Sequence, residues 1–310
     1  MSEHITHTLF ALDCELLLHR FARDMPATLD ALRSHPAAFR SGAICSEGRW
    51  HSITLAQAVR GAESEQAAAA DLAFLVGLRT HDAADRQFKT IYRTLETDYL
   101  LTPERDGPSQ ISIEQDLFLL RLRGSQSAGG PFADALFEEH QGADLNLLAD
   151  LLSDGAARDL LRLSHPSGGD DPGHVFGSRE VFYVDVDRYL AAWSQPAVVA
   201  DRVAEHRLYD QAEPLMQTLA RLQSGEEVAD DALEESLAAL PTRCHYTRAV
   251  ARFMADMDAL QRYLANTISD DDLAAAFQIE TPHITDAVEQ SVGNSLEESR
   301  LLSEWHEAGS

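Results

Sequence analysis

The sequence predicts an all-α fold that forms a single large domain over residues 1–310. Apolar residues recur at spacings of three and four along most of the chain, which places them on one face of a helix. The composition of 45% hydrophobic and 25% charged residues is typical of a chain that folds around a core. Only the segment 180–187 is rich in β-branched and aromatic residues and alternates as a strand does. We therefore expect one helical domain with at most one short strand or hairpin.

The helical period marks ten segments of the chain. Within the seventh, Pro214 is expected to kink or split the helix, because proline removes a backbone donor and clashes with the preceding turn. In the tenth, three aspartates after Ser269 fit an acidic first turn at the positive end of a helix dipole. The segment 294–310 is expected to be a loosely docked end. The predicted helices are 9–25, 26–34, 66–100, 113–123, 131–140, 145–163, 196–223, 230–240, 247–267 and 269–277.

The charge of the chain excludes two classes of partner. With 25 Lys+Arg against 51 Asp+Glu, the formal net charge is −26, which repels phosphate backbones and anionic membrane surfaces. We therefore expect neither nucleic-acid binding nor membrane binding. The first residues lack the basic and apolar regions of a secretory signal, so a cytoplasmic location is expected.

One helix of the sequence carries a histidine on its apolar side. Phe74, His81, Phe88 and Leu95 follow one another at seven-residue spacing within the predicted helix 66–100. His81 is therefore expected to face the core, where an unpaired polar group costs about 1–3 kcal/mol. Two interpretations follow from the residues alone: a hydrogen-bonded core histidine, or a functional group in a buried site.

The segment around His81 resembles a known family. His81-x-Ala83 followed by Phe88-Lys89-x-Ile91 is similar to the distal-histidine helix of tryptophan 2,3-dioxygenase, where the same two segments stand at the same separation. That enzyme belongs to the histidine-ligated haem-dependent aromatic oxygenases, and in length and helical character the chain resembles the shorter tyrosine hydroxylases of this superfamily.

The resemblance implies a haem-dependent mono-oxygenase that acts on a small tyrosine- or tryptophan-like substrate in a biosynthetic pathway. It implies haem b as the cofactor and His81 as a catalytic residue on its distal side, which binds the oxidant or takes a proton from the substrate. Phe74, Phe88 and Tyr92 then wall the substrate pocket. The Gly-Thr-Gly-Gly-type loop of the dioxygenase is missing, and its nearest counterpart is 173–178; this favours hydroxylation over dioxygenation.

A haem of this class needs one imidazole on the iron, with an acceptor for its other ring nitrogen. We expect His206 to be this metal ligand, because Val203 and Val199 lie one and two turns before it in the predicted helix 196–223 and place it on or beside the apolar face. Asp210 is then a candidate acceptor one turn later. His174, in the loop rich in glycine and serine, is the alternative ligand. Without haem, His206 is interpreted as an exposed helix histidine.

A second class of function competes with the enzyme. An acidic helical interaction protein, of the adaptor or immunity type, would use the negative charge to bind a basic protein partner. The dipeptide His81-Asp82 also occurs in metal-dependent phosphohydrolases, but no spacing rule places the further ligands of such a site. The sequence leaves open the substrate, the oxidant and whether the chain forms a homodimer.

Overall fold

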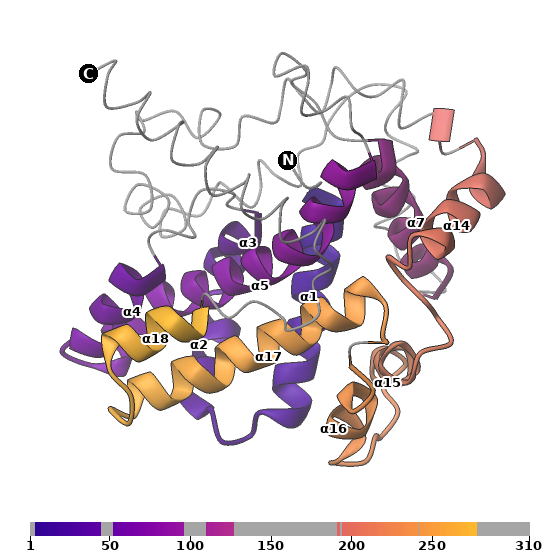
Figure 1. Cartoon of the computed structure of the whole chain (residues 1–310). Helices are drawn as coiled ribbons and strands as arrows, with labels where there is room; N and C mark the ends of the chain where they lie inside the picture. The colour runs from indigo at the N-terminus through magenta and orange to yellow at the C-terminus, as the bar shows by residue number, and fades with distance from the viewer. Residues whose placement is uncertain are drawn as a thin grey trace, which may run out of the picture.

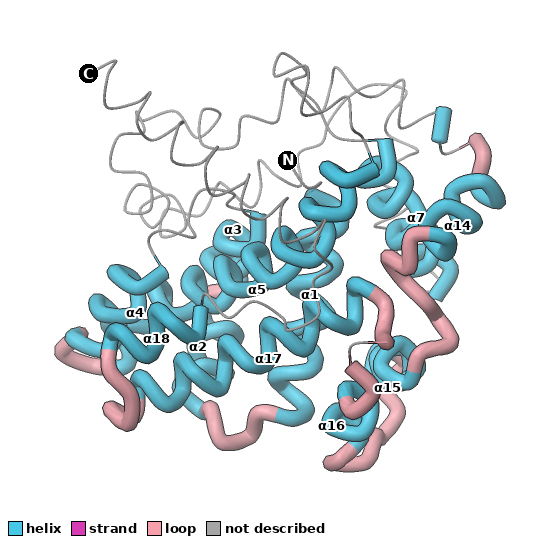
Figure 2. Tube along the Cα trace, in the orientation of Figure 1, coloured by secondary structure: helices cyan, strands magenta, loops and turns pink. Residues whose placement is uncertain are grey.

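The computed structural model describes residues 4–44, 52–95, 110–126, 191–192, 194–240 and 242–277. All regular elements in these ranges are helices, which confirms the predicted all-α class. Figures 1 and 2 show them as a bundle of helices, and the loops that are described between them are short. In chain order the labelled helices are α1 (His4–Phe21), α2 (Pro26–Ser34), α3 (Pro36–Ile44), α4 (Ser52–Gly61), α5 (Glu65–Leu95), α7 (Gln110–Gln126), α14 (Pro196–Glu205), α15 (Pro214–Gln223), α16 (Ala232–Leu237), α17 (His245–Leu264) and α18 (Asp270–Phe277).

Several predicted helices need correction. The first begins at His4 and not at residue 9, and α3 and α4 were not predicted at all. The predicted helix 196–223 is two helices, because α14 ends at Glu205 and Pro214 begins α15. The segment is therefore split, which is one of the two expected outcomes, but the break already begins after Glu205, and Pro214 is the first residue of α15. The predicted helices 131–140 and 145–163, the strand at 180–187 and the segment 294–310 lie outside the described residues.

Helix α5 is the centre of the packing. It contacts α1, α2, α3, α4, α7 and α17, and α17 runs beside it in Figure 1. Its segment 72–78 is apolar on nearly every side, and Phe74, Leu75, Val76 and Leu78 are all fully buried. A helix that is hydrophobic all round is stable only inside a protein, so the other helices must enclose it. None of the described helices is long and apolar enough to span a membrane.

The backbones of α3 and α5 approach each other closely where the two helices cross. A Cβ atom added to Gly42 would lie 2.2 Å from the carbonyl oxygen of Phe74, and one added to Gly77 would lie 1.9 Å from that of Phe39. Such distances are far below van der Waals contact, so only glycine fits at either position. The two glycines let the backbones of α3 and α5 touch, and each lies against the backbone of the other helix.

A buried group of charges joins α5 to three other helices. The Arg79 guanidinium donates to Asp82 at 2.7 Å, to Asp256 of α17 at 2.6 Å and to Ser52 of α4 at 3.3 Å. It also lies over the ring of Phe277 at the end of α18, 4.1 Å from the ring centroid. Burial alone lowers the pKa of Arg79, but Asp256 and Asp82 outweigh it and raise the pKa above its ordinary value. Arg79 therefore stays charged.

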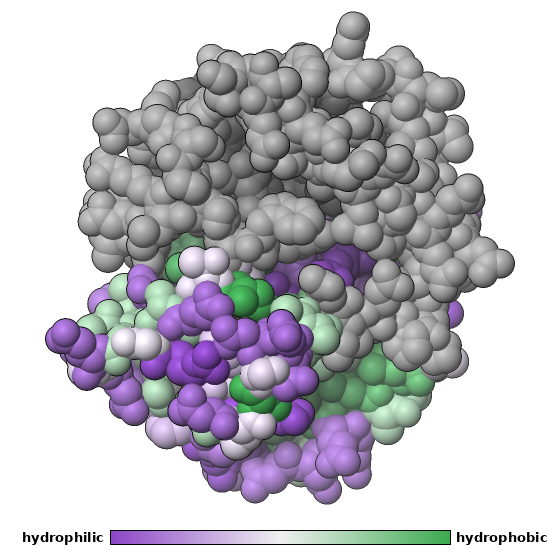
Figure 3. Space-filling model, turned by 60° about the vertical axis from the view of Figure 1, so that its left-hand side comes forward, coloured by the Kyte–Doolittle hydropathy of each residue, from purple (hydrophilic) through white to green (hydrophobic). Residues whose placement is uncertain are grey.

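The surface of the described helices is mixed. In the view of Figure 3, hydrophilic residues cover much of the described surface, with small hydrophobic patches between them. Among the described residues, the large hydrophobic side chains that are exposed are Val198 and Leu240. Two isolated residues do not form an apolar docking face.

We predict that Gly77→Ala destabilises the fold by about 2–3 kcal/mol, because its Cβ can be accommodated only if α3 moves away from α5. Gly61→Ala is the matched control, since a Cβ there meets nothing within 4 Å and alanine stabilises a helix by about 0.5–1 kcal/mol relative to glycine. Urea unfolding followed by far-UV circular dichroism measures both. Equal stability of the two variants would contradict the close crossing.

We predict that Arg79→Met lowers the free energy of unfolding by about 2–4 kcal/mol, because each of the two buried carboxylates that it bridges loses one of its two arginine partners. The control is Arg33→Met, whose side chain is 60% exposed and pairs with the exposed Asp30. An exposed pair of this kind contributes less than about 1 kcal/mol. Thermal or urea unfolding should therefore show a much larger loss of stability for Arg79→Met than for Arg33→Met. A loss below about 1 kcal/mol for Arg79→Met would contradict the role of Arg79 as the buried cation of this group.

Candidate metal centre

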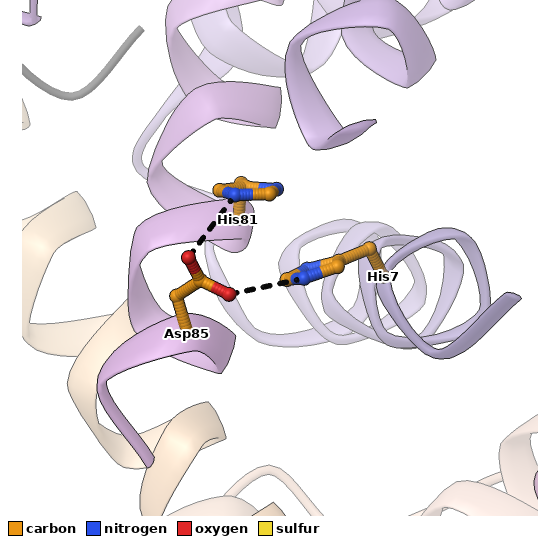
Figure 4. A group of neighbouring side chains, drawn as sticks. All are labelled: His7, His81 and Asp85. Carbon is orange, nitrogen blue, oxygen red and sulfur yellow. Dashed lines mark ion pairs between the residues drawn. The ribbon is translucent and has the colours of Figure 1, made fainter. Parts of the chain in front are cut away.

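Two histidines and one aspartate meet between α1 and α5. The Nε2 atom of His7 lies 3.3 Å from Oδ1 of Asp85, and the Nε2 atom of His81 lies 3.4 Å from Oδ2 of the same carboxylate. Figure 4 shows the carboxylate below the ring of His81 and beside the ring of His7, with each of its oxygens directed at one of them. One ligand atom from each residue lies within 4.8 Å of the others. Both histidines are buried, and Asp85 is partly buried.

The local structure explains how the three side chains meet. His81 and Asp85 are four residues apart in α5, so they lie on the same face one turn apart. His7 comes from the first half of α1, which packs against that face. The two imidazole rings stack with their centroids 4.0 Å apart and their planes 17° apart, as Figure 4 shows. The stacking turns both Nε2 atoms towards one carboxylate.

The protonation of His81 is set by α3. Its Nδ1 atom lies 3.0 Å from the carbonyl oxygen of Ala43, which can only accept a hydrogen bond, so Nδ1 carries a proton. Ala43 stands in the last turn of α3, where carbonyl groups have no partner within the helix. The crossing at Gly42 and Gly77 brings this carbonyl within reach, because Ala43 lies against the backbone of Gly77.

This hydrogen bond has an electrostatic consequence at the other end of the ring. In a neutral imidazole with its proton on Nδ1, the Nε2 atom bears a lone pair. That lone pair faces an oxygen of Asp85, and Nε2 of His81 is buried with no hydrogen-bond partner among the described residues. Two electron-rich atoms at this distance repel each other unless a positive charge lies near both. The arrangement therefore favours a proton or a metal ion in the cluster.

The donor set suits a transition metal ion. Imidazole nitrogen binds iron, zinc, copper and nickel, and two imidazoles with one carboxylate are the protein ligands of many mononuclear iron and zinc centres. The carbonyl of Ala43 has the role that a backbone acceptor has behind a metal-bound histidine, where it fixes the tautomer and the ring orientation. Three protein ligands leave coordination positions open for water, oxidant or substrate.

The predicted pocket residues are buried where they can be described. Phe74 and Phe88 are fully buried in α5, and His81 faces the core as predicted. The backbone of Tyr92 belongs to α5, but its side chain lies outside the described residues. Phe88 forms part of an aromatic group with Tyr246 of α17, at 6.2 Å between ring centroids.

The predicted iron ligand His206 is not part of this cluster. The helix expected to carry His206 ends at Glu205, so the prediction that His206 and Asp210 share one helix is wrong. His206 is the partly exposed residue that follows the last turn of α14. Asp210 instead accepts a hydrogen bond from the backbone of Ala212 at 2.8 Å. His174 lies outside the described residues.

Sequence reasoning missed two of the three cluster residues. Asp85 had a usable signal, since it follows His81 by one helical turn on the buried stripe. The dipeptide His81-Asp82 pointed instead to Asp82, which in the structure forms ion pairs with Arg79 and Arg86. His7 had no signal, because the first helix was expected to begin after it.

Comparisons with known proteins do not identify the centre. No protein-family model, no curated protein and no solved structure matches the chain.

Proposed function

We propose that the chain is a metal-dependent oxidoreductase in which His7, His81 and Asp85 bind one divalent iron ion. One observation carries the proposal. In the neutral imidazole, the buried Nε2 atom of His81 bears a lone pair because Nδ1 donates its proton to Ala43, and this Nε2 atom faces the carboxylate of Asp85 beside a second imidazole. Protein ligands are arranged in this way around a cation.

Oxygen chemistry is favoured over hydrolysis by two considerations. Two histidines and one carboxylate with open positions form the ligand set of non-haem iron(II) oxygenases. The resemblance of the His81 segment to an oxygenase helix supports the same class of reaction. When bound, iron supplies activation of the oxidant. The chain holds the ion, keeps the His81 imidazole in one tautomer and excludes bulk water from the two buried rings.

A small aromatic molecule is the proposed substrate class. The support is the resemblance of the His81 helix, together with the aromatic side chains one to two turns beyond the cluster. Phe88 packs against Tyr246, which in turn contacts Phe10 of α1 at 5.2 Å between ring centroids. Apolar aromatic surroundings of a metal site favour flat apolar ligands with few polar groups.

We predict that the purified protein binds one equivalent of Co²⁺, used as a coloured substitute for iron, and that His81→Ala or Asp85→Ala weakens this binding at least about 100-fold. Each substitution removes a ligand and leaves the remaining set too small for tight binding. The visible absorption bands of Co²⁺ report the binding during titration, and metal analysis gives the stoichiometry.

The control is His19→Ala. His19 is another histidine of α1 that lies near a carboxylate, Glu15, at 3.8 Å, but its side chain is 29% exposed. This variant should bind Co²⁺ as the unmodified chain does. Binding of Co²⁺ that is unaffected by His81→Ala would refute the proposed centre.

Haem remains a second candidate, on the resemblance of the His81 helix and on the burial of His81 beside Phe74 and Phe88. In that case His81 would be the distal residue, and His206 or His174 the iron ligand. The stacking of His81 on His7 at 4.0 Å leaves no space for a macrocycle between the two rings, so haem would have to lie beyond the pair. The geometry therefore supports this candidate less than it supports the first.

The visible spectrum separates the candidates. A haem protein should show an intense Soret band after expression with sufficient haem, and His206→Ala should change it. The mononuclear centre predicts no such band on haemin titration, but metal binding as described above. A chain that takes up neither haemin nor metal would favour the acidic interaction protein, whose binding to a basic partner should weaken with added salt.

A further inference from the structure

The N-terminal turn of α1 is attached to α7 through one buried carboxylate. Asp116 of α7 is fully buried, and its Oδ1 atom accepts a hydrogen bond from the backbone N–H of Thr6 at 2.7 Å. The Thr6 hydroxyl donates to the same oxygen. Thr6 directly precedes His7, the only cluster residue on α1.

This contact supplies a hydrogen-bond acceptor that α1 itself cannot supply. The first four N–H groups of a helix have no acceptor within it, and Thr6 is the third residue of α1. A carboxylate is a favourable acceptor there because of the positive end of the helix dipole. Here the carboxylate comes from a helix more than 100 residues later in the chain, with a sequence separation of 110.

The position of Thr6 determines the position of His7, because the two residues are neighbours in the same helix. Neighbouring Cα atoms in a helix are about 3.8 Å apart and their backbone dihedrals are held by the helix. Fixing the amide of Thr6 therefore fixes where the Cα–Cβ bond of His7 starts. The ring of His7 has to reach one oxygen of Asp85 while stacking on His81, so a small rotation of this turn would separate the ligands.

We propose that Asp116 is a positioning residue for the metal ligand His7, an inference that rests on the metal centre proposed above. Asp116 acts through the backbone and hydroxyl of Thr6 and does not itself bind the metal. Loss of its acceptor oxygen frees the first turn of α1 and so weakens and distorts metal binding.

The chain contains a matched control for this role. Glu213 also accepts one backbone N–H and one threonine hydroxyl at the start of a helix, from Cys244 at 2.6 Å and from Thr247 at 2.6 Å. It does so at α17, and it is not part of the metal cluster. Glu213→Ala therefore removes the same kind of buried contact without touching the turn that carries His7.

The test is a Co²⁺ titration of the full-length chain, with affinity and the positions of the visible bands as two readouts. Asp116→Ala should weaken binding about 10–100-fold, the range found when groups behind a metal ligand are removed, and should shift the bands. Asp116→Asn, which keeps an acceptor oxygen, should recover most of the affinity. Glu213→Ala should bind Co²⁺ with the affinity and spectrum of the unmodified chain.

The outcomes distinguish this inference from the proposed centre. If the unmodified chain binds Co²⁺ through His81 and Asp85 but Asp116→Ala changes neither affinity nor spectrum, only the positioning role is overturned. Equal losses in Asp116→Ala and Glu213→Ala would also overturn it, since they would reflect general stability. Should Asp116→Ala fail to fold, Thr6→Val keeps the backbone bond and should give a smaller loss with shifted bands; wild-type behaviour of that variant would overturn the inference.

Discussion

The backbone contact between α3 and α5 is the constraint on which the other features depend. Two glycines, Gly42 and Gly77, allow it, and each occupies space that any side chain would deny to the facing helix. The contact buries the apolar middle of α5, and it also carries a carbonyl group of α3 to the ring of His81. Packing and the chemistry of one imidazole are therefore set by the same few atoms.

Helix α5 presents ionisable groups to two different environments. Asp82 lies with Arg79 and Arg86, so its negative charge is matched by guanidinium groups. Asp256 of α17 completes this group with Arg79. Asp85, nearly one turn further along α5, faces two imidazoles. Carboxylates three residues apart thus have distinct roles: Asp82 belongs to a structural ion-pair group, and Asp85 to a site that favours a cation.

The sequence predicted the fold class well because long amphipathic helices determine it. The period around Phe74, His81 and Phe88 placed the buried face of α5 correctly, and Pro214 marked a real break. The short helices α3 and α4 were missed, since nine or ten residues containing glycine and serine give a weak period. Their helical state depends on packing against α5, which a local pattern does not contain.

The candidate site was predictable only in part, for a related reason. His81 could be found because its own helix shows that it is buried. Its partners could not, since His7 meets it through the packing of α1 on α5, and the Ala43 acceptor depends on a helix crossing. The expected ligand His206 rested on a helix that continues past Glu205, but the chain turns there, with Arg207 at a positive φ of 52°.

The separation of the proposed ligands along the chain has a thermodynamic consequence. His7 and His81 are held by different helices, so the donor set exists only when α1 is packed on α5, and the unfolded chain offers nothing comparable. An ion bound in this way stabilises the folded state by mass action, by about 2.7 kcal/mol when its free concentration is 100 times the dissociation constant. With the ion in place, the supply of metal in the surroundings therefore becomes one of the quantities that determine how much of the chain is folded.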